Sequence, residues 1–266
     1  MIARLGFSFV NMIAGASVSA SSEMAGFPGS NAQKIGHPQE PWKTDAGDLG
    51  EQTYVADLGE AMAPRVFSLS RANVDTIVLE ANSSDEWADP PVMLTFDIAR
   101  NIYNWRYQVG AYLDAGLSYQ FWRLRIPDQT PLDGASSYAI SGFWLGDVVF
   151  PPSHFLYDIE FKTIRPGVKV DLVTGGSRIV KTGNPCAGIS AQRTARIDRI
   201  RPGYGDQLAA WSEIDRQRWE AGRYLMVLDG VDTTQAFVVD ESGDLAWQRQ
   251  SVLRSHSALV FTEANE

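Results

Sequence analysis

Short runs of alternating apolar and polar residues constrain the fold of this chain more than any other feature. The clearest run, QFWRLRI, spans residues 120–126. Successive side chains of a β-strand point to opposite faces. Arg123 and Arg125 therefore fall on one face of this run, and Trp122 and Leu124 fall on the other. The pattern predicts a strand with Phe121 on the same face as the two arginines and Ile126 on the opposite face.

Similar strand-like runs recur along the chain and are separated by turn residues. In the first half they cover residues 7–14, 52–59, 63–71, 76–81, 92–98, 102–109, 120–126 and 138–150. In the second half they cover residues 156–165, 167–173, 177–181, 189–200, 224–229, 235–239 and 251–262. Many short runs at this spacing predict an all-β fold built from antiparallel sandwiches.

Pro151 and Pro152 interrupt the strand pattern and predict a domain boundary there. We expect one β domain over residues 1–152 and a second β-rich domain over residues 153–266. The second domain contains the one predicted helix, over about residues 205–221, because Leu208, Trp211 and Ile214 recur at a helical spacing. Gly222 is a suitable stop.

The first 20 residues have two interpretations. One arginine, an apolar stretch and small residues near position 20 are typical of a weak secretory signal. However, Ser8, Asn11 and Gly15 break the apolar stretch. A first strand over residues 7–14 is the interpretation that we favour.

Composition excludes several kinds of partner and site. The net charge is −9 and the pI is about 4.9, so a phosphate-binding groove and a nucleic-acid partner are not expected. Cys186 is the only cysteine, and His37, His154 and His256 are scattered, so we expect no metal and no cofactor. No apolar stretch reaches 18 residues, so we expect no membrane insertion.

Acidic residues are the first candidates for catalysis, because acid–base hydrolysis needs two carboxyl groups a few ångströms apart. The candidates are Asp57, Asp85, Glu86 and Asp97, and each lies at a predicted turn or strand end. Solvated turn carboxylates are the simpler interpretation. We therefore expect that the protein is not an enzyme, although a carbohydrate-active enzyme stays open as a third hypothesis.

Aromatic residues are candidates for carbohydrate contact, because the apolar faces of sugar rings stack on aromatic rings. Trp42 and Trp87 lie in polar, loop-like segments, where a large ring is unusual. Tyr103, Trp105 and Tyr107 recur at every second position, which places all three on one strand face. Trp87, Tyr103 and Trp105 are the candidate sugar contacts, and packing between sheets is the alternative.

Four arginines form the main basic cluster of the sequence. They are Arg193, Arg196, Arg199 and Arg201. In an acidic protein such a strip can receive an acidic neighbouring subunit. We treat it as a candidate subunit interface, and a solvated strand face is the alternative.

Residues 20–59 carry a series of motifs that resembles the start of a discoidin-type, galactose-binding-like jelly roll. The series is a Ser-rich strand, the segment Phe27-Pro28-Gly29-Ser30-Asn31, the isolated Trp42, and a strand that ends in Asp57-Leu58-Gly59. The run FWRL at residues 121–124 and residues 140–146 resemble later strands of that family. The resemblance implies an N-terminal jelly-roll β-sandwich in which Trp42 is a packing residue.

The combination of both halves resembles tail proteins of tailed phages and of tail-like particles. The second half matches at residues 159–173, 206–221, 224–229 and 252–262. The resemblance implies a structural virion protein of a tail tip or baseplate, made in the host cytoplasm. Its implied partners are copies of itself in a three- or six-fold ring, neighbouring hub, tail-tube or receptor-binding proteins, and a host glycan. A lectin-like module that binds host cell-surface polysaccharide is the alternative hypothesis.

Overall fold

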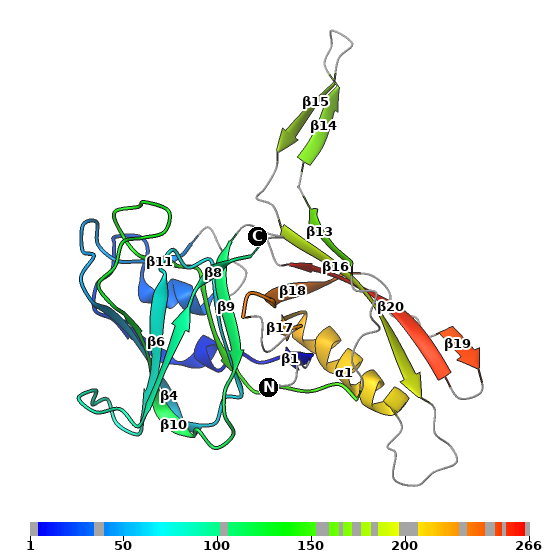
Figure 1. The fold of residues 1–266 in the computed structure, drawn as a ribbon, viewed down its shortest axis with the longest axis horizontal. Helices are drawn as coiled ribbons and strands as arrows, with labels where there is room; N and C mark the ends of the chain where they lie inside the picture. Colours follow the sequence, from blue (N-terminus) through cyan, green and yellow to red (C-terminus); the bar gives the residue numbers. More distant parts are fainter. Residues whose placement is uncertain are drawn as a thin grey trace.

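The structure is a computed structural model. It describes residues 5–34, 40–101, 106–152, 160–164, 167–171, 177–181, 186–196, 207–228, 233–242, 248–251 and 254–263. Antiparallel β-strands dominate this part of the chain, and one α-helix accompanies them (Figure 1). The predicted all-β fold is confirmed.

Two antiparallel sheets form a sandwich in the first half of the chain. The five-stranded sheet runs in the order β2 (Ser17–Ala20), β4 (Gln52–Met62), β10 (Tyr119–Ile126), β6 (Thr76–Asn82) and β7 (Val92–Asp97). The four-stranded sheet runs in the order β12 (Gly142–Gly146), β5 (Val66–Ser70), β9 (Tyr107–Tyr112) and β8 (Ala99–Arg100). The same half also contains β3 (Trp42–Lys43) paired with β11 (Ala139–Ile140), and the 3₁₀ helices η1 (Met12–Gly15) and η2 (Gly29–Gln33).

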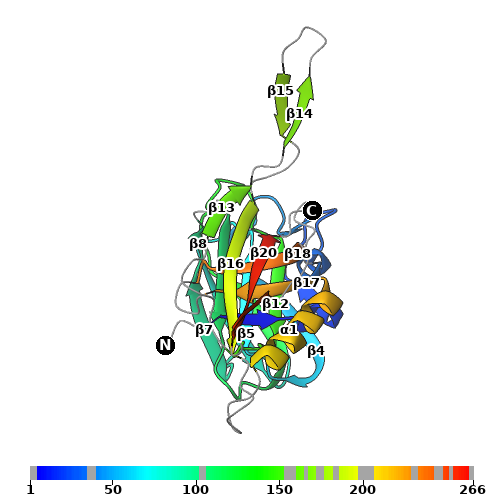
Figure 2. The same ribbon diagram turned by 90° about the vertical axis from the view of Figure 1, so that its right-hand side faces the viewer.

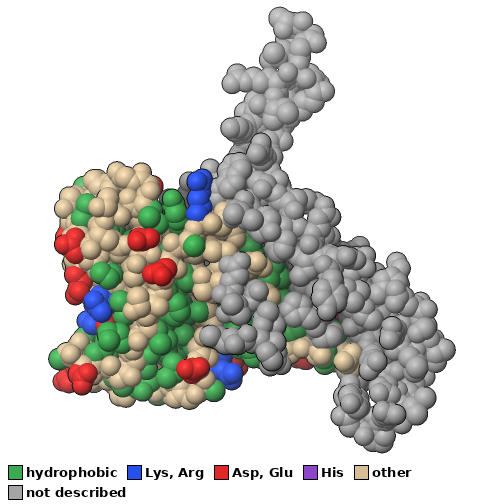
Figure 3. All heavy atoms as spheres, viewed as in Figure 1, with side chains coloured by type: hydrophobic (Ala, Val, Ile, Leu, Met, Phe, Trp, Pro, Cys, Tyr) green, Lys and Arg blue, Asp and Glu red, His purple; other side chains and the backbone are tan. Residues whose placement is uncertain are grey.

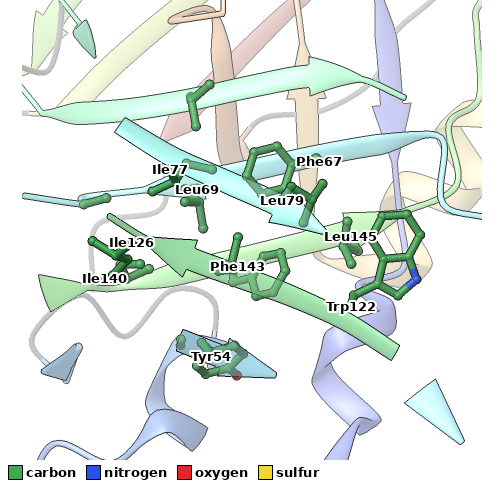
Figure 4. Packing of buried hydrophobic residues seen from close by; sticks show 14 of the residues in the cluster. Tyr54, Phe67, Leu69, Ile77, Leu79, Trp122, Ile126, Ile140, Phe143 and Leu145 are labelled. Carbon is green, nitrogen blue, oxygen red and sulfur yellow. The ribbon is translucent and has the colours of Figure 1, made fainter. Parts of the chain in front are cut away.

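The core of the sandwich lies between these two sheets (Figure 4). Trp122 and Leu124 of β10 share one face, as their alternation predicts, and this face points into the core, where both are fully buried. Phe143 of β12 meets Tyr54 of β4 edge to face across the core, with 5.7 Å between ring centroids. Because inward residues from both sheets interdigitate, the sandwich buries a continuous apolar layer.

Trp42 belongs to this core, as the sequence resemblance implied. Its side chain is 1% exposed, and its ring lies 5.3 Å from that of Tyr54. The indole Nε1 donates a hydrogen bond of 3.0 Å to the carbonyl oxygen of Ser22. A buried tryptophan needs such an acceptor, so Trp42 packs the core and pins the Ser-rich segment to it.

Strand β4 continues beyond Gly59, where the sequence predicts its end. Gly59 has a φ of +80°, and its amide donates to Oδ1 of Asp57. The pairing with β10 shifts register between Tyr119 and Phe121. Tyr119 pairs with Met62 rather than with Gly59, so three extra residues of β4 form an irregular bulge around the left-handed Gly59, and the strand continues to Met62.

The second half of the chain builds a larger antiparallel sheet. This seven-stranded sheet runs in the order β1 (Gly6–Ser8), β17 (Arg223–Val227), β18 (Ala236–Ser242), β20 (Arg254–Glu263), β16 (Cys186–Arg196) and β13 (Glu160–Ile164), with β19 (Gln248–Ser251) also paired to β20. The division of the chain at residue 152 stays a prediction. One strand crosses it, because β1 pairs with β17 although it comes from the N-terminus.

The N-terminal segment is therefore not one strand over residues 7–14. Strand β1 stops at Ser8, and η1 follows after Asn11. The Asn11 side chain accepts from the amide of Ile13 and donates to the carbonyl of Phe143. An asparagine that caps the next turn in this way ends an extended segment.

The two halves stack directly on each other. Strand β17 is buried on both sides: Leu225 and Val227 join a cluster with Val66 and Trp144 of the four-stranded sheet. The alternating Tyr224 faces the helix α1 (Gln207–Ala221), which lies against β16 and β17. The layers are thus the five-stranded sheet, the four-stranded sheet, the seven-stranded sheet and α1 (Figure 1).

Polar contacts join the four-stranded and seven-stranded sheets as well. Nε2 of Gln108 donates to the carbonyl oxygens of Thr234 and Ala236, at 2.5 and 2.9 Å. The amide of Gly110 donates to the carbonyl of Thr233 at 2.8 Å. Since Gln108 is buried, its bonds are shielded from water and help to hold the four-stranded and seven-stranded sheets together.

Helix α1 buries one face, as the predicted apolar stripe requires. Trp211 and Ile214 are buried, and the Arg218 guanidinium is buried between Asp215 and the hydroxyl of Tyr224. The helix ends at Gly222, whose φ is +66°, so the predicted stop is confirmed.

A β-ribbon extends from the edge of the seven-stranded sheet. Strand β13 pairs with β16, and the intervening chain forms the hairpin of β14 (Gly167–Asp171) and β15 (Ser177–Lys181). This hairpin is a separate two-stranded sheet. It stands away from the body of the molecule in both perpendicular views (Figures 1 and 2).

Candidate functional site

The candidate site lies on the outer face of the five-stranded sheet. The opposite sheet of the sandwich is covered by the seven-stranded sheet, so this face is the sandwich surface that no other sheet of the described chain covers. Strand β10 lies in the middle of it, and its alternation turns Arg123 and Arg125 outward. In the sheet register Arg123 lies between Val55 of β4 and Glu80 of β6.

Glu80 is the anchor of the site. Its side chain is 2% exposed, although it lies on the outer face of β6. Arg123 Nε contacts Glu80 Oε2 at 2.6 Å, and Arg125 Nε contacts Glu80 Oε1 at 3.0 Å. Each carboxylate oxygen therefore has its own guanidinium. Two such partners compensate the negative charge of the buried carboxylate, and the carboxylate holds both arginines in place.

Arg125 makes ion pairs with two carboxylates. In addition to Glu80, it contacts Oε2 of the exposed Glu51 through Nη1 at 3.2 Å. Burial lowers the pKa of Arg125, but the hydrogen bonds to Glu80 and Glu51 outweigh it and raise the pKa above its ordinary value. Arg125 Nη2 lies 3.9 Å from the sulfur of Met93, whose side chain is 62% exposed. Arg125 thus serves to tie β10 to the flanking strands.

Trp87 covers the other arginine. The loop between β6 and β7 brings it back over the sheet, so that Arg123 Cζ lies 4.4 Å from the ring centroid. Its Nε1 donates a 2.6 Å hydrogen bond to Oδ1 of Asp85. At the start of the loop, Nδ2 of Asn82 donates to the carbonyl of Glu86 at 2.5 Å. These bonds fix the half-buried indole over the guanidinium, in a cation–π contact.

Arg123 keeps unused hydrogen-bonding capacity. Its Nε is bonded to Glu80, but its two Nη groups have no hydrogen-bond partner within the described chain. The side chain is 13% exposed. The site therefore presents fixed N–H donors beside an aromatic ring, and the carboxylates of Glu51 and Asp85 contact the neighbouring Arg125 and Trp87. Such an arrangement can bind a ligand that both donates and accepts hydrogen bonds.

The predicted sugar contacts have different outcomes. Trp87 lies in the site, over Arg123. Tyr103 and Trp105 lie outside the described residues, so their shared face with Tyr107 stays a prediction. Arg123 and Glu80 were not among the candidates. The alternation of β10 predicts that Arg123 lies on the face opposite Trp122, but only the pairing of β6 with β10 brings Glu80 to it.

The predicted arginine strip stays untested. Arg193 and Arg196 lie in β16, and Arg199 and Arg201 lie outside the described residues.

The described residues show neither a metal-binding cluster nor a membrane-spanning helix. Among the residues that the structure describes, His, Cys, Asp and Glu side chains do not gather in groups of three or more that suit a metal ion. In the same part of the chain, α1 is too short and too polar to cross a bilayer.

Comparison with known proteins gives structural likenesses alone. No family model matches the chain, and no curated protein matches it in sequence. Solved structures that resemble it include chitosan-binding module 1 of a chitosanase/glucanase from Paenibacillus sp. IK-5, at 18% identity and a TM-score of 0.38, over 51% of this chain and 98% of that one. The lectin domain of lectinolysin complexed with Lewis b antigen matches at 12% identity and a TM-score of 0.41, over 52% and 96%.

Not every similar structure is a carbohydrate-binding module. Reduced XRCC1 bound to the DNA pol β catalytic domain matches at 13% identity and a TM-score of 0.40, over 48% of this chain and 93% of that one. At these identities and TM-scores, the likenesses carry no argument about what this chain does.

Proposed function

We propose that this protein is a structural component of a tailed-phage tail tip or baseplate. In this role the seven-stranded sheet and its ribbon contact copies of the same chain and neighbouring tail proteins, and the sandwich lies outside. The sequence resemblance motivates the assignment. The observation that supports it is the projecting β14–β15 hairpin.

A projecting hairpin is suited to assembly for a physical reason. A two-stranded ribbon by itself is marginally stable in water, and its edges carry backbone donors and acceptors that are ready to pair with another chain. Here the ribbon continues from a sheet edge and stands apart from the rest of the molecule (Figure 2). A neighbouring polypeptide would bury it and satisfy its edges. Because the hairpin and its target differ, the contact is heterologous and can close into a ring.

The test replaces residues 167–181 by a short Gly-Ser turn. Light scattering at a series of concentrations then gives the mass of the full chain and of the variant, and negative-stain microscopy shows their shape. We expect the full chain to form closed rings and the variant to be monomeric, with an unchanged melting temperature. Gly15→Ala, at a position with no neighbour within 4 Å of the added methyl, is the control for assembly. A full chain that is monomeric at every concentration and that binds no tail component contradicts the proposal.

A lectin-like function is the second candidate, and the placement of Trp87 over Arg123 favours it. A fixed indole beside unused N–H donors is a suitable sugar platform, and it lies on the open face of the sandwich. The two functions are compatible in one protein. A glycan array with the full chain and with Trp87→Ala tests the second: loss of a specific signal in the variant supports it, and an unchanged signal counts against it.

A further inference from the structure

The Arg123 guanidinium is held in place more firmly than a surface arginine usually is. Glu80 bonds its Nε, the sheet lies beneath it, and Trp87 covers one face at 4.4 Å. Trp87 is itself held by Asp85. Because the side chain is already ordered, a ligand that binds its Nη groups loses little conformational freedom there. The unused Nη edge is therefore prepared for a ligand.

The charges around this edge indicate what kind of ligand fits. The site contains two arginines and three carboxylates, those of Glu51, Glu80 and Asp85. It therefore has no excess positive charge, and the whole chain has a net charge of −9. Over the described part of the face drawn in Figure 3, acidic side chains are scattered with few basic ones between them. A carboxylate or sulfate ligand would meet this negative field.

Neutral hydroxyl groups match the site better. A hydroxyl both accepts and donates hydrogen bonds and carries no charge, so it can accept from Arg123 without meeting the repulsion that an anion would. The two Nη groups of an arginine lie side by side in a rigid fork. Two neighbouring hydroxyls on a sugar ring present acceptors at a similar separation, and the apolar face of such a ring can stack on an indole.

We propose that Arg123 and Trp87 form a binding site for a neutral saccharide on the outer face of the five-stranded sheet. The Nη groups of Arg123 donate to a pair of neighbouring ring hydroxyls, and Trp87 packs against the sugar. Glu80 is a positioning residue, because it acts through Arg123. This inference rests on the lectin-like function proposed above and adds the ligand class and the residue that recognises it.

The experiment measures binding of the full chain to immobilised polysaccharides by affinity electrophoresis. The neutral probes are dextran and galactomannan, and the acidic probe is polygalacturonate. Arg123→Lys keeps the charge and one bond to Glu80 but removes the paired Nη groups, so we expect affinity to fall about tenfold, as for the loss of one or two hydrogen bonds. Trp87→Ala should abolish binding. Trp219→Ala removes an indole that is 78% exposed on α1, and it should leave binding unchanged.

The outcomes separate this inference from the proposal on which it rests. Binding of a neutral probe that falls in Arg123→Lys and in Trp87→Ala, with melting temperatures retained, supports the inference. If Trp87→Ala abolishes binding but Arg123→Lys binds as well as the unchanged protein, the lectin-like function stands and the role of Arg123 is overturned. Binding of polygalacturonate alone overturns the ligand class. Binding of none of the probes overturns both.

Discussion

Gly110 lies where the four-stranded sheet meets the seven-stranded sheet, and its substitution tests whether the two halves form one packed body. A methyl group added to Gly110 would lie 2.1 Å from the Cβ of Ala236. Both residues lie within strands: Gly110 of β9 pairs with Ser68 of β5, and Ala236 of β18 pairs with Val227 of β17. Neither backbone can move alone, so Gly110→Ala forces the two sheets apart.

The size of the effect follows from this geometry. Ordinary contact between such carbon atoms needs 3.4–4 Å, so the sheets must separate by more than an ångström at this point. Overpacking of a close-packed interior costs about 1–3 kcal/mol. The separation also stretches the 2.8 Å bond from Gly110 to the carbonyl of Thr233, which adds about 1 kcal/mol. We expect the free energy of unfolding to fall by about 2–4 kcal/mol.

Urea unfolding followed by tryptophan fluorescence measures this loss. With a slope of about 3 kcal/mol per molar urea, the midpoint should fall by about 1 M. Gly15→Ala, which adds the same methyl group where no atom lies within 4 Å, is the matched control and should change the midpoint little. If the two variants unfold at the same urea concentration, the sheets are not in close contact at Gly110, and the layered arrangement is wrong there.

Three further changes test the core, the site and the helix. Trp42→Phe removes the buried bond to the Ser22 carbonyl and part of the ring, so thermal unfolding should show a loss of about 2 kcal/mol. Glu80→Ala removes the shared partner of two arginines, so chemical denaturation should show a loss of about 2–3 kcal/mol. Hydrogen bonds from Arg216 and then Gln217 lower the pKa of the exposed Glu213 to about 2, so carbon-detected NMR titration should find it there and find a value closer to ordinary in Arg216→Gln. Because the folded pKa is lowered, any stabilisation from this pair is present above the ordinary value and is lost as the pH falls towards 2.

Each of these changes has its own control. Trp219→Phe alters an indole that is 78% exposed and should leave the melting temperature unchanged, whereas an equal loss in both tryptophan variants would refute the role of the Trp42 bond. Glu51→Ala removes an exposed partner of Arg125, which is worth at most about 1 kcal/mol. A Glu80→Ala variant no less stable than Glu51→Ala would show that Glu80 is not an anchor. An ordinary Glu213 pKa in the unchanged protein would contradict the helix contacts.

Much of the sheet structure is predictable from local pattern. In β10 the alternation that buries Trp122 and Leu124 is a property of seven consecutive residues, so the sequence alone shows it. The helix was predicted equally well, because Trp211 and Ile214 recur at helical spacing and Gly222 ends the helix. Both features depend on neighbours in the chain rather than on the rest of the fold.

Features that depend on distant parts of the chain were missed. Strand β1 covers only Gly6–Ser8, and its partner, β17, lies more than 200 residues later in the sequence. The strand β4 passes Gly59 because a bulge preserves its pairing with β10. Neither pairing partner can be identified from local alternation, so the predicted ends of these strands were wrong.

The candidate site was predicted only in part, for the same reason. Trp87 was identified because a large ring in a polar loop is unusual. Glu80 lies in the predicted strand-like run of residues 76–81, but the two arginines that it binds are 43 and 45 residues away in the sequence. Sheet topology brings these groups together, and the sequence pattern of β6 contains no sign of it.

The proposal that the protein is a tail component has a direct test in the particle itself. Antibodies raised against the purified chain are bound to tailed particles from the phage or strain that encodes it, and gold label is located by electron microscopy. We predict that the label gathers at the tip of the tail, and that particles lacking the protein carry none. Intact particles without label, prepared from a lysate in which the free protein is abundant, would contradict the proposed function.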